Sequence, residues 1–441
     1  MKLLVVILFF ILFNHCSFDS KSGIWKSGDT IDKKELDQYR EFKTVFINQE
    51  NFNEEVNLEK SFTFNIPNKK IIEDWNDIHF DDSNNFDNLS FSDEKRFISL
   101  SKKISRYKVD DFFLYENDKF IFTDIKGNLI IFSKNLNKVI TRYNFYKKNF
   151  KKLKKKLNII LDDGIIYVTD NIGYVYAFNA EKKIILWAKN TKIPFRSNLK
   201  IRNDKLIAAD ENNNIYFFNK DNGDILKKIP TEETLIKNSF SNNFSLSKNS
   251  ILILNTYGSL FSINEEDLNI KWVINLNKSV ELNPRNLFNS KTIINDDKNI
   301  IVASQEATYI IDLDGGIVNY KFNIVSQVKP LLIGNHLFLI SKNDLLICID
   351  TQKGEIIYSY DINKKISDFL KIKKQKALFK YIYFANNKIF ILLTNSYVIE
   401  FKLNGNLKNI FKLPKKVNSS LLFINDSIVY LDKKRKLITL N

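Results

Sequence analysis

The feature that most constrains this chain is a phrase that recurs from about residue 119 to the C-terminus. Each copy has a short apolar run, a polar turn with Asp, Asn or Gly, and a second apolar run. The clearest copy, IIYVTDNIGYVYAFN, runs from Ile165 to Asn179 and is followed by Ile184-Ile-Leu-Trp187. The first turn residues of the successive copies are Asp124, Asp170, Asp210, Asn255, Ser304, Ser341, Thr394 and Asp432, a period of about 44 residues.

This period predicts an all-β propeller. Two central strands and their tight turn need about 15 residues, and two outer strands with their loops take the rest of a four-stranded antiparallel blade. The hairpins therefore predict about eight blades, with seven or eight left open. A β-solenoid is the alternative, but its turns are usually shorter than this period.

The chain ends on the last hairpin, so the final blade needs a strand from the sequence before the repeats. Ser61-Phe-Thr-Phe-Asn-Ile66 alternates apolar and polar residues, and we expect it to close the ring. Closure of this kind removes free sheet edges. Residues 59–441 are accordingly assigned to a propeller closed by an N-terminal strand.

Residues 1–15 have the form of an export signal. The apolar run Leu3–Phe13 is too short to span a bilayer, and a Cys follows it at position 16. This pattern resembles the bacterial lipoprotein signal, which implies acylation of Cys16, and Ser17 as the second mature residue implies the outer membrane. His15 departs from the pattern, so a periplasmic signal peptide or an uncleaved anchor stays open. Residues 16–58 are read as a polar tether with a short helix over 31–46.

The composition limits the chemistry that this chain can perform. With 44% hydrophobic and 13% aromatic residues, the chain can build a core. Its two Cys, at 16 and 348, exclude a multi-disulfide scaffold and a four-Cys zinc site. Cys348 is expected to pack in a core strand. The net charge of +16 accompanies a bias toward Lys, Asn and Ile that is typical of AT-rich genomes, so it names no partner.

The copy at Tyr167–Ala180, followed by Leu186-Trp187, resembles the repeat of quinoprotein-type propellers. Trp272 fits the same strand-final position, and Tyr143, Tyr320, Tyr358 and Phe411 are expected to replace it in degenerate copies. Two families share this repeat: quinone-dependent dehydrogenases and the non-enzymatic BamB-like lipoproteins of outer-membrane β-barrel assembly. The lipoprotein-like Cys16, the tether, and Asp74-Trp75 leading to Asn84–Leu89 resemble the second family.

This chain has few of the residues that the enzymes with this repeat use for catalysis. Alcohol-oxidising members imply a carboxylate base, Ca²⁺ ligands and often a vicinal Cys pair, and this chain has no vicinal Cys. Sugar-oxidising relatives imply a His base, but His79 and His336 are expected to be solvated loop residues. The recurring Asp residues fit turns better than a metal site. We therefore expect no catalytic residue, no cofactor and no metal, with a periplasmic quinone-dependent dehydrogenase or ligand-binding propeller as the alternative.

The BamB-like resemblance implies a periplasmic scaffold that binds the barrel-forming subunit of the assembly complex, and also unfolded outer-membrane proteins. In that family an interblade loop carries an apolar residue beside an Arg, which here corresponds to Phe195 and Arg196. The alternative is a loop in which Phe195 packs inward and Arg196 is solvated. The family's second contact, an Asp pair, has no counterpart, because Glu232 and Glu233 are shifted.

A run from Lys147 to Lys156 places seven Lys around Phe150 and Leu153. Contact with anionic lipid headgroups or an acidic partner is one reading, and a solvated loop is the other. Nucleic acid is not expected as a partner of an exported protein. The residues expected to make this surface contact are Lys151, Lys152, Lys154, Lys155 and Lys156.

Overall fold

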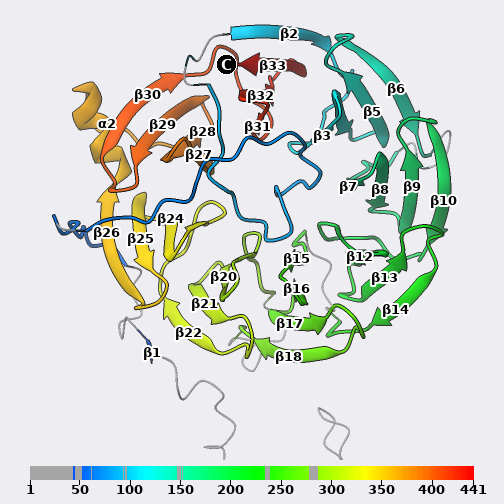
Figure 1. Cartoon of the computed structure of the whole chain (residues 1–441), viewed down its shortest axis with the longest axis horizontal. Helices are drawn as coiled ribbons and strands as arrows, with labels where there is room; N and C mark the ends of the chain where they lie inside the picture. Colours follow the sequence, from blue (N-terminus) through cyan, green and yellow to red (C-terminus); the bar gives the residue numbers. More distant parts are fainter. Residues whose placement is uncertain are drawn as a thin grey trace, which may run out of the picture. The chain divides into compact units, whose positions relative to one another are not determined.

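The ring is an eight-bladed β-propeller (Figure 1), seen in a computed structural model. The structure describes residues 43–44, 52–60, 62–92, 94, 97–146, 150, 152–233, 239–277 and 287–441. The predicted signal, Cys16, Lys151 and most of the tether lie outside these ranges. Within the helix expected over 31–46, Lys43–Thr44 instead form strand β1, which pairs in parallel with an outer strand of the ring.

Four antiparallel strands make each blade, ordered from the axis outward. Blade 1 consists of β3 (Leu114–Glu116), β4 (Lys119–Thr123), β5 (Asn128–Ser133) and β6 (Lys138–Asn144), and blade 2 of β7 (Leu157–Asp162), β8 (Ile165–Asp170), β9 (Tyr174–Asn179) and β10 (Ile184–Asn190). Blade 3 consists of β11 (Lys200–Arg202), β12 (Lys205–Ala209), β13 (Ile215–Asn219) and β14 (Ile225–Ile229). Blade 4 consists of β15 (Asn243–Leu246), β16 (Ser250–Leu254), β17 (Ser259–Asn264) and β18 (Ile270–Asn275).

The second half of the ring repeats this order. Blade 5 consists of β19 (Ile294–Asn295), β20 (Asn299–Ala303), β21 (Thr308–Asp312) and β22 (Val318–Phe322), and blade 6 of β23 (Leu331–Ile333), β24 (His336–Ile340), β25 (Leu345–Asp350) and β26 (Glu355–Asp361). Blade 7 consists of β27 (Phe379–Ala385), β28 (Lys388–Leu393), β29 (Tyr397–Lys402) and β30 (Leu407–Lys412). Blade 8 consists of β31 (Leu422–Ile424), β32 (Ser427–Leu431), β33 (Lys436–Leu440) and β2 (Phe97–Lys103). Helix α2 (Ile362–Leu370) follows blade 6, with Asp361 as its N-cap.

The inner strands are mostly apolar, because both faces of each blade pack on neighbouring blades. All residues of β5, β16 and β24 are buried, whereas the outer strand β10 alternates between exposed and enclosed positions. The predicted hairpins are confirmed, and their Asp residues cap their own turns. Asp170 Oδ1, for example, accepts from the backbone N–H groups of Ile172, Gly173 and Tyr174.

An aromatic side chain on an outer strand of one blade packs on a glycine of the next. The indole of Trp187 covers Gly223 and donates from Nε1 to the Lys220 carbonyl at 2.9 Å. Trp272 covers Gly316 in the same way. The four residues expected to replace Trp also pack on the next blade. Tyr320 packs on Gly354, and the Tyr358 hydroxyl donates to the Leu403 carbonyl. The ring centroids of Tyr143 and Phe178 are 5.0 Å apart, and Phe411 packs on the hydrophobic cluster shared with blade 8.

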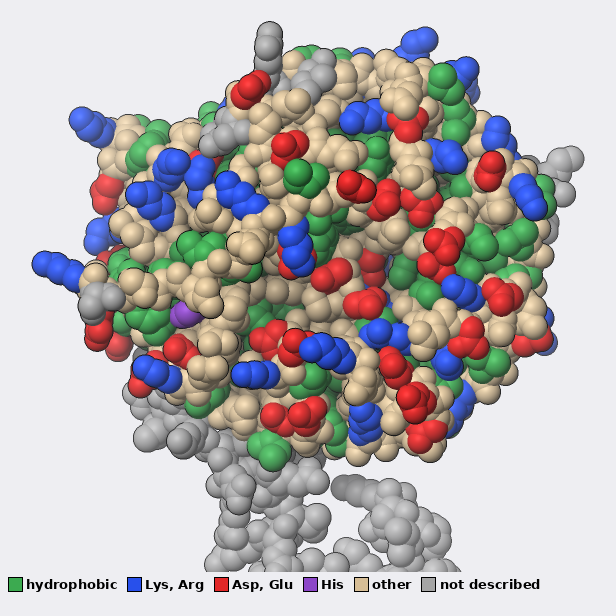
Figure 2. All heavy atoms as spheres, in the orientation of Figure 1, with side chains coloured by type: hydrophobic (Ala, Val, Ile, Leu, Met, Phe, Trp, Pro, Cys, Tyr) green, Lys and Arg blue, Asp and Glu red, His purple; other side chains and the backbone are tan. Residues whose placement is uncertain are grey.

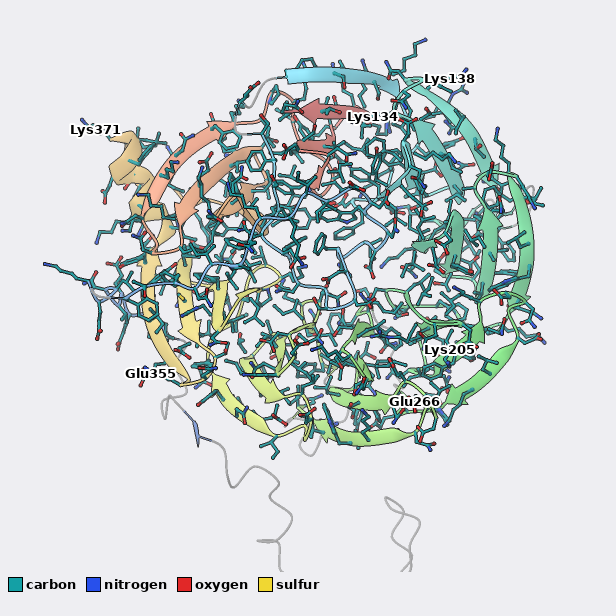
Figure 3. The ribbon with its side chains drawn as sticks, in the orientation of Figure 1. Lys134, Lys138, Lys205, Glu266, Glu355 and Lys371 are labelled. Atoms are coloured by element: carbon teal, nitrogen blue, oxygen red, sulfur yellow. The ribbon has the colours of Figure 1, made fainter. Side chains whose placement is uncertain are left out.

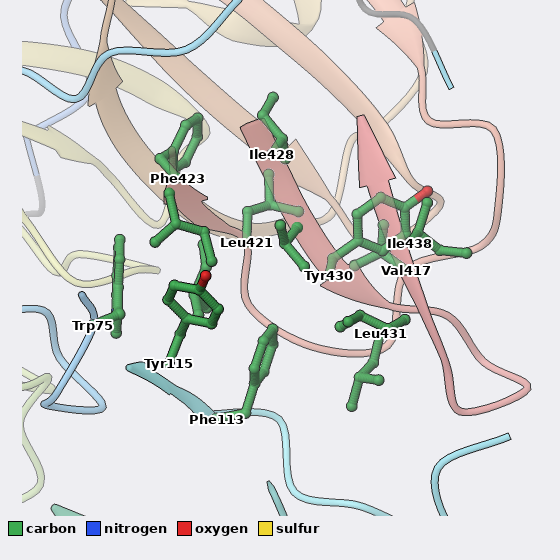
Figure 4. Packing of buried hydrophobic residues seen from close by; sticks show 14 of the residues in the cluster. Trp75, Phe113, Tyr115, Val417, Leu421, Phe423, Ile428, Tyr430, Leu431 and Ile438 are labelled. Atoms are coloured by element: carbon green, nitrogen blue, oxygen red, sulfur yellow. The ribbon is translucent and has the colours of Figure 1, made fainter. Parts of the chain in front are cut away.

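The strand that closes the ring is not the predicted one. β2 (Phe97–Lys103) pairs antiparallel with β33 and completes blade 8, so the expectation for Ser61–Ile66 is wrong. Of that segment, Phe62 and Phe64 instead pack edge-on against the ring of His336. Figure 4 shows the core beside this closure, where Phe423 and Tyr430 of blade 8 pack beside Phe113, Tyr115 and Trp75.

Residues 70–92, here called the central segment, cross one end of the ring and contact every blade (Figure 1). They lie against the turns that join the first and second strands of the blades. In chain order, the hydrogen-bonded pairs are Ile72 with Asn425, Trp75 with Tyr115, Asn76 with Leu161, Asp77 with Lys200, Asp82 with Leu246, Ser83 with Asn295, Asn85 with Leu332, Leu89 with Phe384, and Ser92 with Asp426.

The contact between Trp187 and Gly223 gives a first prediction. A Cβ at Gly223 would lie 2.4 Å from the indole, whereas one at Gly164 meets nothing closer than 4.0 Å, and both residues have similar positive φ. Gly164→Ala therefore reports backbone strain alone and should cost about 1 kcal/mol. Gly223→Ala adds overpacking and should cost about 3 kcal/mol in urea unfolding. Equal losses would contradict this role of the glycine.

The central segment gives a second prediction. Asn84 is fully buried at φ +58°, and its Nδ2 donates to the carbonyls of Phe244 at 2.7 Å and Ile293 at 2.8 Å. Asn84→Gly keeps the φ angle allowed but removes both buried hydrogen bonds, and only the Phe244 carbonyl keeps another donor, Asn198 Nδ2 at 2.9 Å. The substitution should therefore cost about 2 kcal/mol of unfolding free energy. The matched control is Asn137→Gly at an exposed turn with φ +48°, which should change stability by less than about 0.5 kcal/mol.

Candidate binding face and central cavity

Antiparallel blades send alternate connections to opposite ends of the ring. The loops between blades and the turns between second and third strands lie at one end, here called the interblade face. The other end carries the remaining turns and the central segment. Figure 2 views that second end, where Asp and Glu side chains gather around the central hollow. The acidic residues of the central segment are Glu73, Asp74, Asp77, Asp81, Asp82 and Asp87.

A cavity of about 660 Å³ lies on the axis among the interblade loops. Trp75, Ile78, His79 and Phe86 of the central segment contribute to its wall. All eight blades supply the rest, and Ser, Asn and Lys are the commonest residue types among them. Its charged lining consists of Lys108, Lys156, Lys291, Lys329 and Lys380 together with Asp110 and Asp111. Its volume lies in the range usual for small-molecule sites.

Burial shifts the pKa of the groups beneath this cavity. The Nζ of Lys329 lies 3.9 Å from the centroid of the Phe86 ring and donates to the Asn84 carbonyl at 2.5 Å. Desolvation lowers the pKa of this lysine to about 7 and raises that of Asp81 to about 6. Burial, followed by the charges of Lys329 and Lys200, lowers the pKa of His79.

His336 is buried and His79 is half-buried, so the expectation that both are solvated is wrong. His336 begins β24 and is buried between Phe62 and Phe64, and burial lowers its pKa. His79 lies against Phe112 at a ring separation of 5.4 Å. Position in a turn predicted exposure, but the sequence carries no sign that Phe62 and Phe64 cover His336 or that His79 lies on the wall of an axial cavity. Cys348 is buried as expected.

The predicted partner loop has one buried and one accessible residue. Phe195 is 3% exposed and packs on Tyr216 and Phe218, so it does not present a surface anchor. Arg196 keeps 22% of its side chain exposed, and its Nη2 lies 2.9 Å from Glu211 Oε2. Its backbone N–H donates to Ala209, and its carbonyl accepts from Asn242, so the loop is held between blades 3 and 4.

The lysine run is divided by the fold. Lys152, Lys154 and Lys156 are exposed, and Lys156 also lines the cavity. Lys155 is 4% exposed, donates to the Phe150 carbonyl and lies over the Tyr146 ring, so it is not a surface contact.

Glu232, the acidic residue of the following interblade loop, accepts hydrogen bonds from Asn255 and Ser259 and has a structural role.

No helix in the described residues is long and apolar enough to cross a membrane. In the same part of the chain, no group of three or more His, Cys, Asp or Glu side chains is placed to hold a metal ion.

The blade repeat and the aromatic contacts define a quinoprotein-type propeller. The family model of outer membrane protein assembly factor BamB matches residues 138–360, which is half of the chain. The chain therefore belongs to the BamB family. No curated protein sequence matches it.

Solved structures with this fold include both branches of the repeat family. BamB from Moraxella catarrhalis is 12% identical, with a TM-score of 0.59 over 78% of this chain and 99% of that chain. The quinohemoprotein alcohol dehydrogenase from Comamonas testosteroni is 10% identical, with a TM-score of 0.59 over 83% and 80%. A europium-containing methanol dehydrogenase is 9% identical, with a TM-score of 0.58 over 83% and 89%. At these identities the likeness shows the fold alone.

The lowered pKa of Lys329 gives a third prediction. The unfolded chain holds this proton up to the ordinary value of 10.5, and the native protein only to about 7. Between these values native stability should rise with pH. Lys329→Met should remove that contribution, so its urea midpoint should rise less than that of the wild type from pH 7 to pH 9. Lys353→Met, at an exposed turn, is the control and should keep the wild-type slope. Parallel slopes in all three proteins would contradict the assignment.

Proposed function

We propose that this chain is a non-catalytic scaffold lipoprotein that assists the assembly and insertion of β-barrel proteins into the outer membrane. The observation that carries the proposal is the BamB family match across residues 138–360. A lipid on Cys16 would hold the ring at the periplasmic face of that membrane, because acyl chains contribute about 0.8 kcal/mol per buried CH₂.

The scaffold would act through its interblade loops, which the rigid ring presents in fixed positions. Arg196 is the residue best placed to contact the barrel-forming subunit. Its loop backbone is hydrogen-bonded to Ala209 and Asn242, so little conformational entropy remains to be lost on binding. The buried Phe195 holds the loop from beneath, and Glu211 orients the guanidinium.

Outer strand edges offer a second way to engage substrates. Ile184 and Leu186 of β10 and Ile225 and Leu226 of β14 are exposed. Unfolded outer-membrane proteins could add to such edges, as β1 adds to β22 within this chain.

Affinity capture from detergent-solubilised outer membrane tests the scaffold role. The tagged full chain should recover the barrel-forming subunit. Arg196→Glu should reduce the recovered amount at least tenfold, because it places two carboxylates side by side at the contact. Lys192→Glu, in the same loop and exposed, is the matched control and should retain recovery. Thermal unfolding should show that each variant is folded.

Failure to recover the subunit with wild type would sink the assembly role. The dehydrogenase alternative draws on the central cavity and on the shared fold. It would gain support if the purified chain developed cofactor absorbance and reduced a dye when given quinone and Ca²⁺.

A further inference from the structure

One sector of the interblade face combines exposed cations with exposed apolar side chains. Exposed Lys or Arg side chains occupy the loops 371–376, 415–416, 433–434, 106–108 and 152–156, which run from the blade 6–7 connection to the blade 1–2 connection. We call this sector the basic arc. Figure 3 shows Lys371 at its outer end, beside α2 on the rim of the ring.

Large apolar side chains stand between these cations. Leu378 is 59% exposed, Leu153 53% and Ile372 48%. The other members are Phe369 and Leu370 at the end of α2, Tyr107, and Phe150. Phe369, Leu370 and Ile372 are near neighbours in the chain, whereas the other four are spread among the lysines of the arc. None of the seven lines the axial cavity.

Contacts between neighbouring loops show that the arc is continuous across blades 7, 8 and 1. From one end to the other, the linked pairs are Leu378 with Thr394, Leu413 with Ser396, Lys416 with Lys433, Arg435 with Ile104, and Tyr107 with Lys126.

Carboxylates in this sector do not neutralise the exposed lysines of blades 7 and 8. Asp432 is buried in its own turn, where it accepts from the Lys436 backbone. Asp361 caps α2 and pairs with Lys374 at 2.5 Å. Asp368 is the exposed acid of α2, and Asp110 and Asp111, which follow Lys108, are half-buried in the lining of the axial cavity. The arc therefore presents mainly positive charge.

We propose that the basic arc binds the surface of a bilayer that contains anionic phospholipid. Lysines next to such a surface gain from its negative potential, and interspersed apolar side chains enter the boundary between headgroups and acyl chains. A protein partner is the weaker fit, because protein interfaces are depleted in Lys and bury their apolar groups as a central patch. This proposal does not depend on the assembly role.

Vesicle sedimentation tests the proposal with the full chain. Phosphatidylcholine vesicles report attachment by the N-terminal segment alone, and vesicles with one third phosphatidylglycerol add the negative charge. The wild type should bind the anionic vesicles at least tenfold more tightly, with the difference disappearing at high salt. Lys415→Glu, Lys416→Glu, Lys433→Glu and Lys434→Glu together should abolish the difference, because each lysine near the surface is worth roughly fivefold.

The matched control reverses four exposed lysines at the opposite end of the ring, Lys182, Lys183, Lys298 and Lys353, and should retain the preference. Phe369→Ser with Ile372→Ser should weaken binding to anionic vesicles, whereas Leu136→Ser with Ile317→Ser, which are also exposed, should not.

Equal binding of wild type to both vesicles, or equal loss in the two reversed variants, would overturn the proposal. The proposal would also be overturned if the arc variant kept its vesicle binding but no longer captured an acidic protein that the wild type captures. A folded arc variant that loses vesicle binding but still captures the barrel-forming subunit would separate this surface from the proposed assembly contact.

Discussion

The central segment is the constraint on which the rest of the ring depends. The innermost strands are short, and at one end of the ring the central segment supplies hydrogen-bond partners to residues on or beside them. Asn84 and Asn85 supply amide groups to carbonyls of blades 4, 5 and 6, and Asp77 forms a buried ion pair with Lys200 of blade 3. A single stretch of chain thereby joins blades that are far apart in sequence. Because buried polar groups are costly when unpaired, these hydrogen bonds stabilise the closed ring.

The same segment determines where a ligand or partner can approach. The central segment lies at one end of the ring and forms part of the wall of the axial cavity, while the interblade loops surround the rest of it. Its acidic residues give that end a negative character, while the interblade face carries most of the exposed lysine-rich loops. Connections alternate between the two ends along the chain, so charges that look scattered in the sequence are sorted by topology. The net charge of +16 thus becomes informative only in the folded protein.

The parts of the fold that could be predicted are those encoded locally. Each hairpin carries its own turn residues, and Trp187 and Trp272 hold the same position two blades apart, so period and fold class follow from the sequence. The closing strand could not be chosen, because Ser61–Ile66 alternates better than β2, and β2 is selected by its partner β33. The central segment has no period at all, since Asn side chains and irregular backbone make its contacts.

The candidate site shows the same division. The loop that contains Arg196 could be located by counting hairpins, but the direction of Phe195 depends on Tyr216 and Phe218 of the next blade. The basic arc runs from blade 6 through blades 7, 8 and 1 to blade 2, whereas Arg196 lies between blades 2 and 3 on the same face. Lipid binding by the arc would therefore bring Arg196 near the membrane. A subunit that is itself embedded in that membrane could then reach the loop from the side, which makes the two proposed contacts compatible on one ring.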